Sequence, residues 1–447
     1  MQRLFKACPL HSKPRANGFE CGKEGPPRRF TTAINAARAF AARLCLQPIP
    51  VRFLTAATRH QALTLFAAFC AVLVSIFPVP PATAEPLRVV YGFDREFPPF
   101  TYEEPGGKAA GFEIELVDAV FHEADVKIFH RPMLWERVGI ELANGEINLT
   151  TGMVRTEQRS RLYLFSEAAT FRLPIRMFTK TYNRYPDISR LRGQTVGVEQ
   201  ASYPAVLLEQ YGGFNIKLFR NRGEAIRALY NDEVQAYCGP VPNTYYLINT
   251  RNYGGITSMG APLGVAELRA AFSRERGDVR SAFDEGLKKV IDSGEYDRLY
   301  RKWFVREIGD QEGDVMLESA RRASIAAYAP YGGKGAGAAV LTATGKVYSA
   351  CTMENADLSL TVSALRAAVA AAVAAGEYEL RAAVLVDQKG AFMQPAPEDL
   401  QTLGEFGRGV LLVLGRENGR YAAKMTAEIL PGLMLRDIEL RPPPLPE

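Results

Sequence analysis

Short apolar segments alternate with amphipathic segments from Leu87 onward, and this alternation predicts a mostly parallel α/β sheet. The first group of predicted elements comprises strands over 87–92, 126–131 and 147–151 and helices over 114–124 and 135–144. A second group follows Leu191, with strands over 195–199, 215–219 and 235–239 and helices over 203–211 and 222–230. The pattern then returns with a strand over 270–273 and helices over 279–293 and 296–304.

Two βα units in one chain, with the last segment returning to the first, predict a two-lobed clamp over 85–308. We expect the chain to cross between the lobes near 171–178 and 262–272. Lobe 1 then comprises about 86–175 and 270–305, and lobe 2 about 176–269. Because ligands of open α/β sheets lie outside the carboxyl ends of the strands, the cleft between the lobes is the expected ligand site.

An uncharged apolar run, Leu63–Val79, precedes a small-residue segment that ends at Ala84. A basic flank, an apolar stretch and an Ala-x-Ala pattern predict a signal peptide over 62–84, with cleavage after Ala84 and a periplasmic mature protein. The alternative is an uncleaved signal that anchors the protein in a membrane, although the run is shorter than the roughly 20 residues of a spanning helix. Residues 1–61 form a basic extension of low pattern, which suggests a start codon assigned too early.

The overall charge of +5 misleads, because residues 1–61 carry +9 and the remainder carries −4. This balance argues against nucleic-acid binding by the folded part, which would need a basic face. Beyond the signal only Cys238 and Cys351 remain, and two distant cysteines make neither a disulfide framework nor a metal cluster. We therefore expect small buried hydrophobic residues there, with no cofactor and no metal.

A second unit follows an acidic, glycine-containing segment over 309–315, which reads as a linker. This alanine-rich unit covers about 316–440. A Pro-rich tail over 441–447 ends the chain.

Several motifs of the first unit occur in the order of one known family. They are Gly92-Phe93-Asp94, Phe97-Pro98-Pro99-Phe100, Gly111-Phe112-Glu113-Ile114-Glu115-Leu116, Gly145-Glu146-Ile147-Asn148, Thr156-Glu157-Gln158-Arg159, Phe165-Ser166, Gly294-Glu295-Tyr296 and Lys302-Trp303-Phe304. In this combination the chain resembles the family 3 extracellular solute-binding proteins, which serve polar amino-acid transporters. The resemblance implies an α/β fold of the periplasmic-binding-protein-like type II, a bilobed clamp. It also implies ABC-transporter membrane subunits or a sensor as partner.

Arg159 is the strongest candidate for contact with a ligand, because a guanidinium is a planar, always charged donor that meets a carboxylate bidentately. The resemblance implies that Arg159 clamps the α-carboxylate of the solute. Backbone N–H groups at Thr151, Gly152 and Val154 would assist. The helix N-terminus at Ser202 and Tyr203 would assist as well, since such termini favour anions.

Three further residues lie at positions where family members contact the ligand's side chain. Phe97 and Trp135 would hold an apolar or cationic body by stacking, although Trp135 could equally be core. Asp94 would contact a basic side chain or, equally, cap a turn.

Pro240 departs from the family pattern, which places an aspartate here to pair with the ligand's α-ammonium. A buried ammonium without a partner is costly, so a small carboxylic acid without an amine fits these residues as well as an amino acid does. Glu199 or Asp232 could replace the missing carboxylate.

The second unit resembles the cytidine deaminases, which implies an additional α/β/α domain. The matching segments are Ala326–Tyr331, Gly337–Thr342, Gly345–Tyr348, Met353–Ala356, Gln401, Glu405-Phe406 and Glu428–Pro431. Such enzymes use a zinc ion with three Cys or His ligands and a glutamate that moves protons. At the corresponding positions this chain has Ser363, Ala396 and Asp399 for the ligands and Leu365 for the glutamate.

These replacements predict a domain without zinc and without deaminase activity. The family's asparagine for nucleoside contact is also replaced, by Thr352, and only Glu354 is kept. The expected roles are therefore structural, including oligomerisation through this domain, or a ligand pocket without chemistry.

Three functions remain open from the sequence. The first is a binding protein for a small carboxylate-bearing solute, and the second is an enzyme that dehydrates a prephenate-like acid on the same clamp. The third is a scaffold that binds nothing in the cleft. Against the enzyme, the four histidines (His11, His60, His122 and His130) and the glutamates form no evident acid–base pair.

Overall fold

The computed structural model describes residues 87–430 except 123, 125, 184 and 186. The predicted extension over 1–61, the signal over 62–84 and the tail over 441–447 lie outside the described residues. Within the described part of the chain, no helix is long and apolar enough to cross a membrane.

A nine-stranded mixed sheet forms the frame of the first domain, in the order β10-β9-β11-β8-β12-β6-β1-β5, with β7 paired to β12. Its strands are β1 (Leu87–Asp94), β5 (Val126–Met133), β6 (Leu149–Val154), β7 (Leu164–Phe165), β8 (Phe171–Lys180), β9 (Thr195–Glu199), β10 (Asn215–Phe219), β11 (Ala236–Pro240) and β12 (Ile256–Phe272). A small separate sheet contains β2 (Glu96–Phe97), β3 (Thr101–Glu103) and β4 (Ala109–Ala110).

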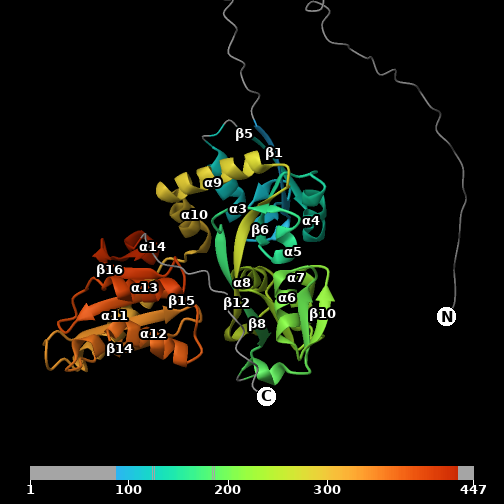
Figure 1. The fold of residues 1–447 in the computed structure, drawn as a ribbon. Coiled ribbons are helices and arrows are strands. Elements are labelled where there is room, and N and C mark those ends of the chain that lie inside the picture. Colours follow the sequence, from blue (N-terminus) through green and yellow to red (C-terminus); the bar gives the residue numbers. More distant parts are fainter. Residues whose placement is uncertain (1–86, 123, 125, 184, 186, 431–447) are drawn as a thin grey trace, which may run out of the picture. The chain divides into compact units, whose positions relative to one another are not determined.

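Helices cover this sheet in two groups, which correspond to two lobes (Figure 1). Lobe 1 carries α3 (Phe112–Phe121), α4 (Trp135–Ala143), α5 (Glu157–Ser160), α9 (Gly277–Asp292) and α10 (Glu295–Phe304). Lobe 2 carries η1 (Ile188–Leu191), α6 (Tyr203–Tyr211), α7 (Arg222–Tyr230) and α8 (Val241–Thr250). The bilobed α/β clamp that the sequence predicted is therefore confirmed.

Strands β8 and β12 carry the chain between the lobes (Figure 1). They pair antiparallel from Ile256 opposite Lys180 to Leu268 opposite Phe171, with one irregularity in register. The crossings predicted near 171–178 and 262–272 fall on these two strands. Because one strand leaves lobe 1 and the other returns to it, they run in opposite directions, and the sheet is mixed rather than mostly parallel.

Lobe 1 is held by aromatic packing and by a close helix contact. The rings of Phe100, Phe112 and Phe171 meet at centroid distances of 4.9 to 6.5 Å within its buried core. Helices α3 and α9 approach so closely that a Cβ on Gly286 would lie 2.3 Å from the carbonyl oxygen of Val120. Glycine at this position thus permits the contact between the two helices.

The second domain has a five-stranded sheet in the order β14-β13-β15-β16-β17. Its elements are α11 (Asp310–Ile325), β13 (Ala336–Thr342), β14 (Val347–Cys351), η2 (Leu358–Leu360), α12 (Ala364–Ala374), β15 (Leu380–Asp387), α13 (Pro397–Glu405), β16 (Leu411–Glu417), β17 (Arg420–Met425) and α14 (Thr426–Ile429). Residues of α11 share one buried cluster with the sheet, and residues of α12 and α13 share another. This arrangement is the predicted α/β/α domain.

The segment over 309–315, which we expected to be a linker, instead begins helix α11. Acidic residues Asp310 and Glu312 lie in the first turn, where carboxylates favour a helix, and Glu312 accepts a hydrogen bond from the backbone N–H of Gly309 (3.2 Å). Gly313 lies against the ring of Tyr421, which a Cβ would approach to 2.2 Å. A glycine at position 313 therefore lets the ring of Tyr421 pack against the helix, and it does not mark a flexible linker.

Ion pairs connect the two domains within one compact unit. Arg408 pairs with Asp297 of α10 at 2.8 Å, and Arg176 of β8 pairs with Glu379 at 2.6 Å. The second domain thus contacts elements of both lobes.

Candidate ligand-binding site

A cavity lies between the lobes and holds about 60 Å³ of water-accessible space. Lobe 1 and lobe 2 both line it, and residues of β8 and β12 form an apolar floor. Of the predicted site residues, it is lined by Phe97, Trp135, Gly152, Val154, Arg159, Ser202 and Tyr203; the floor comprises Leu173, Ile175, Ala266 and Leu268. Most of the site residues that we predicted from the sequence therefore line one cavity.

Arg159 belongs to the one-turn helix α5, which its own motif builds. The hydroxyl of Thr156 caps this turn by accepting a hydrogen bond from the backbone N–H of Arg159 (3.2 Å). The guanidinium donates to the carbonyl oxygens of Val154 (3.0 Å) and Ala201 (3.2 Å), and burial lowers the pKa of Arg159. Within the described part of the chain, no carboxylate forms an ion pair with it.

Trp135 begins helix α4 and faces the same carbonyl group. Its indole N–H donates to the carbonyl oxygen of Ala201 at 3.4 Å, and its ring lies 5.9 Å from the guanidinium carbon of Arg159. Ala201 adopts a left-handed conformation with φ of 54°. The indole N–H of Trp135 and the guanidinium of Arg159, both from lobe 1, therefore donate to the same carbonyl oxygen, that of Ala201 in lobe 2.

Ser202 and Tyr203 stand at the N-terminus of α6, as predicted. The hydroxyl of Ser202 donates to the carbonyl oxygen of Glu199 (2.6 Å) and accepts from the backbone N–H of Ala205 (3.4 Å). Because these bonds occupy the hydroxyl, the contribution of Ser202 to a ligand would come from its backbone and from the helix terminus.

Thr151 and Gly152 differ in their relation to the cavity. The Thr151 hydroxyl turns away from it and bonds to the phenol of Tyr91 at 2.5 Å. Gly152 has φ of +73° and lies close to Phe97 and Glu113. Glu113 is fully buried below this segment, accepts a hydrogen bond from Thr170 (2.9 Å), and its burial raises the pKa of its carboxyl group to about 7.

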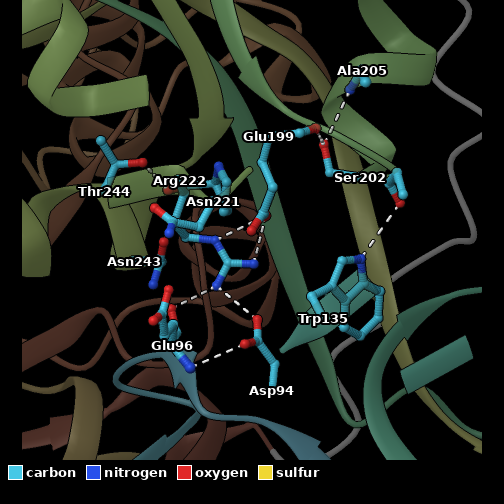
Figure 2. A network of polar contacts seen from close by, with 12 residues as sticks. Asp94, Glu96, Trp135, Glu199, Ser202, Ala205, Asn221, Arg222, Asn243 and Thr244 are labelled. Carbon is cyan, nitrogen blue, oxygen red and sulfur yellow. Dashed lines mark hydrogen bonds and ion pairs between the residues drawn. The ribbon is translucent and has the colours of Figure 1, made fainter. Parts of the chain in front are cut away.

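Asp94 caps a turn, which is one of the two predicted alternatives, and it also contacts a cation (Figure 2). One oxygen accepts from the backbone N–H of Glu96 (3.0 Å), and the other pairs with Nη1 of Arg222 (3.1 Å). The cation, however, belongs to the protein itself. Asp94 lies behind Arg222 and does not line the cavity.

Arg222 also lines the cavity, and we did not predict it from the sequence. It comes from the first turn of α7 and pairs through Nη2 with Glu199 at 2.7 Å (Figure 2). Burial raises the pKa of Glu199 to about 7, and the neighbouring carboxylates raise the pKa of Arg222 despite its burial. Its place at a helix start after β10, at the carboxyl end of a strand, was the signal that could have identified it.

The two residues that we considered as replacements for the missing α-ammonium partner differ in their relation to the cavity. Pro240 lines the cavity, at the end of β11. Glu199 lines the cavity too, but it is bound to Arg222. Asp232 is exposed and accepts a hydrogen bond from Tyr182 (2.5 Å), and it does not line the cavity.

The lobes also meet directly at the mouth of the cleft. Gln200 of lobe 2 donates to Glu136 of lobe 1 at 2.9 Å, and the amide of Asn243 bonds to the carbonyl oxygen of Pro98. The described conformation of the clamp is thus a closed one.

The three predicted zinc-ligand positions of the second domain lie together but do not fit a zinc ion. The hydroxyl of Ser363 bonds to Asp399 (2.5 Å), and the guanidinium Nε of Arg366 lies 3.4 Å from the same oxygen. Ala396 offers no side-chain donor, and Leu365 is fully buried in the core. Among the described residues, no group of three or more His, Cys, Asp or Glu could hold a metal.

Comparison with known proteins agrees with both domains. Residues 89–306 match the model of the bacterial extracellular solute-binding proteins, family 3, and residues 318–419 match the cytidine deaminase-like model. The arginine-binding periplasmic protein of Mannheimia haemolytica is 23% identical over 214 residues, which are 46% of this chain and 87% of that protein. The arginine-binding extracellular protein ArtP of Bacillus subtilis is 24% identical over 226 residues, 49% of this chain and 87% of that protein.

The second domain has relatives of its own. A cytidine deaminase of Mycobacterium tuberculosis is 34% identical over 104 residues, 23% of this chain and 78% of that protein.

The chain also resembles solved structures of binding proteins. The arginine-, lysine-, histidine-binding protein ArtJ of Geobacillus stearothermophilus is 27% identical, with a TM-score of 0.45, and the comparison covers 49% of this chain and 96% of that one. By the two family-model matches, residues 89–306 belong to the bacterial extracellular solute-binding proteins of family 3 and are followed in the same chain by a cytidine deaminase-like domain.

Proposed function

We propose that this protein captures a small carboxylate-bearing solute in the periplasm and presents it to an ABC transporter or a sensor. The observation that carries this proposal is the state of Arg159. Its guanidinium faces the cavity and, among the described residues, its hydrogen-bond acceptors are two carbonyl oxygens. A carboxylate offers such a cation a charge as well as two acceptor atoms, so it would displace weaker partners.

The rest of the cavity supports a ligand with an apolar body. The floor residues Leu173, Ile175 and Leu268 are buried and apolar, and Trp135 flanks Arg159. Gly152, Val154 and the N-terminus of α6 lie beside the same space, where the positive end of the helix dipole favours an anion. The arginine-binding names of the relatives agree with an α-carboxylate at Arg159.

The proposal is tested by isothermal titration of the refolded protein, which is first unfolded to remove any ligand that copurifies. The two panels are amino acids, such as L-alanine and L-arginine, and the amine-free acids of matching length. We expect Arg159→Ala to weaken binding by about a hundredfold, the loss of two charge-assisted hydrogen bonds. Arg161→Ala is the matched control, because Arg161 is exposed and pairs with Glu157 on the protein surface. Binding that Arg159→Ala leaves unchanged would refute the proposal.

We also propose that the second domain is not catalytic and serves assembly. Its support is the hydrogen-bonded Ser363–Asp399 pair at the positions where a deaminase needs thiolates. Two measurements test this: deamination of cytidine followed by ultraviolet absorbance, and the molar mass of the full chain by light scattering. Turnover of cytidine, or a strictly monomeric chain, would contradict the respective part.

One observation favours the enzymatic alternative. Glu199 lines the cavity with a pKa of about 7, which suits a general acid or base near neutral pH. Incubation with prephenate, followed by nuclear magnetic resonance, tests this alternative. Product formation that Glu199→Gln abolishes would establish it, and no product would leave the binding protein as the function.

A further inference from the structure

Each of the three side-chain nitrogens of Arg222 donates at least one hydrogen bond inside the cleft (Figure 2). Its Nε and Nη2 both donate to one oxygen of Glu199, at 3.1 and 2.7 Å. Its Nη1 donates to Asp94 (3.1 Å) and to the carbonyl oxygen of Glu96 (2.9 Å). The flat face of the guanidinium lies 4.3 Å from the centroid of the Phe97 ring.

These contacts are those that a site for a free guanidinium ligand would provide. Two carboxylates supply charge, a carbonyl oxygen accepts a further N–H, and an aromatic ring covers one face. The partners come from both lobes, since Asp94, Glu96 and Phe97 precede α3 while Glu199 and Arg222 belong to lobe 2. All three charged residues are buried, with exposed fractions of 4 to 7%.

We propose that Arg222 is a built-in occupant of a cation subsite in the cleft, and that it excludes solutes with a cationic side chain. That a carboxylate occupies the rest of the cavity, beside Arg159, rests on the proposed function. The existence of the cation subsite does not rest on it. The solute class that follows is a small acid with a neutral body, held at Arg159.

Charge balance supports this exclusion. Among the described residues that line the cavity, Glu199 is the one with a carboxylate. If the cationic group of a solute bound to Glu199 in place of Arg222, both hydrogen bonds from Arg222 to Glu199 would be lost. The incoming cation would also leave the buried guanidinium of Arg222 with Asp94 as its one remaining carboxylate partner among the described residues. A buried charge that loses half of its counter-charge is strongly unfavourable, so basic solutes are rejected.

A purely structural salt bridge between the lobes makes a different prediction. In that case the removal of Arg222 lowers stability but creates no binding site. A cation subsite, by contrast, becomes available to a soluble guanidinium once the tethered one is removed.

The experiment compares the full-length wild-type protein with Arg222→Ala, using n-propylguanidinium as the probe in isothermal titration. We expect the variant to bind the probe at least about tenfold more tightly than the wild type does. The gain should disappear in Arg222→Ala/Asp94→Asn, which removes one carboxylate of the subsite. Arg220→Ala is the matched control, because Arg220 precedes the same helix but its side chain is exposed and lies 3.9 Å from Glu136.

If Arg222→Ala does not fold alone, its refolding yield is measured with and without the probe. Recovery only with the probe supports the subsite, and equal yields overturn it. A folded variant that binds the probe no better than the wild type also overturns it. Because n-propylguanidinium has no carboxylate, it does not depend on Arg159, so failure of the carboxylate panel alone would refute only the proposed function.

Discussion

Glu113 should make the stability of the solute-binding domain fall as the pH rises towards 8. Its carboxyl group is fully buried, and burial raises its pKa from the ordinary 4.5 to about 7. A carboxyl group with a raised pKa binds a proton more tightly in the folded state than in the unfolded state. Its contribution to stability is therefore complete below pH 4.5 and is lost as the pH rises through 7.

The substitution Glu113→Gln removes this titration and keeps an acceptor for the hydroxyl of Thr170. The two pKa values correspond to about 2–3 kcal/mol of unfolding free energy between pH 5 and pH 8. We expect the variant to gain this amount relative to the wild type over that range. Because Glu199 titrates in the same window, the difference between the two proteins isolates Glu113.

Urea unfolding followed by tryptophan fluorescence measures this difference. Both tryptophans of the chain, Trp135 and Trp303, lie in the solute-binding domain, so the signal does not report the second domain. Glu209→Gln, at an exposed position of α6, is the matched control. Parallel stability curves for Glu113→Gln and the wild type across this pH range would refute the reasoning.

Three further predictions concern the cavity, a helix contact and the second domain. Pro240→Asp should raise affinity for L-alanine over propionate by about tenfold in calorimetry, since it adds a carboxylate beside the ligand; an unchanged ratio would mean that no amine reaches this position. Gly286→Ala should lower the unfolding free energy by about 2–4 kcal/mol, because its Cβ meets a backbone oxygen, and a smaller loss would show that α3 and α9 can separate cheaply. Treatment with a zinc chelator should leave the melting temperature unchanged. Asp399→Ala should lower the unfolding free energy by only about 1 kcal/mol, because the half-exposed side chain of Arg366 can turn to solvent once its partner is removed.

Local signals in the sequence predicted the elements of lobe 2 well. The predicted ranges 195–199, 203–211, 215–219 and 222–230 agree with β9, α6, β10 and α7. In α6, a serine cap, a proline in the first turn and apolar periodicity all indicate the same start. In α11, by contrast, glycine and acidic residues are typical of both a linker and a helix start, and only the packing of Tyr421 on Gly313 distinguishes them.

In the cavity too, contacts within a short segment could be predicted from the sequence, and contacts between distant segments could not. Arg159 is predictable because its motif is contiguous and builds its own helical turn. The pairing of Arg222 with Asp94 joins residues 128 positions apart, and no local pattern indicates that their side chains meet. Such a contact depends on closure of the two lobes and is visible only in three dimensions.

The Ser363–Asp399–Arg366 cluster has an evolutionary consequence for the second domain. A single substitution to cysteine at Ser363 or Asp399 would not create a zinc site, since the other donors would still be absent. It would, however, remove the hydrogen bond that joins the start of α12 to α13 and disturb the pairing of Arg366 with a buried carboxylate. Each such first step is thus unfavourable without benefit, so the hydrogen-bonded cluster itself is a barrier to the gain of a metal site at these two positions.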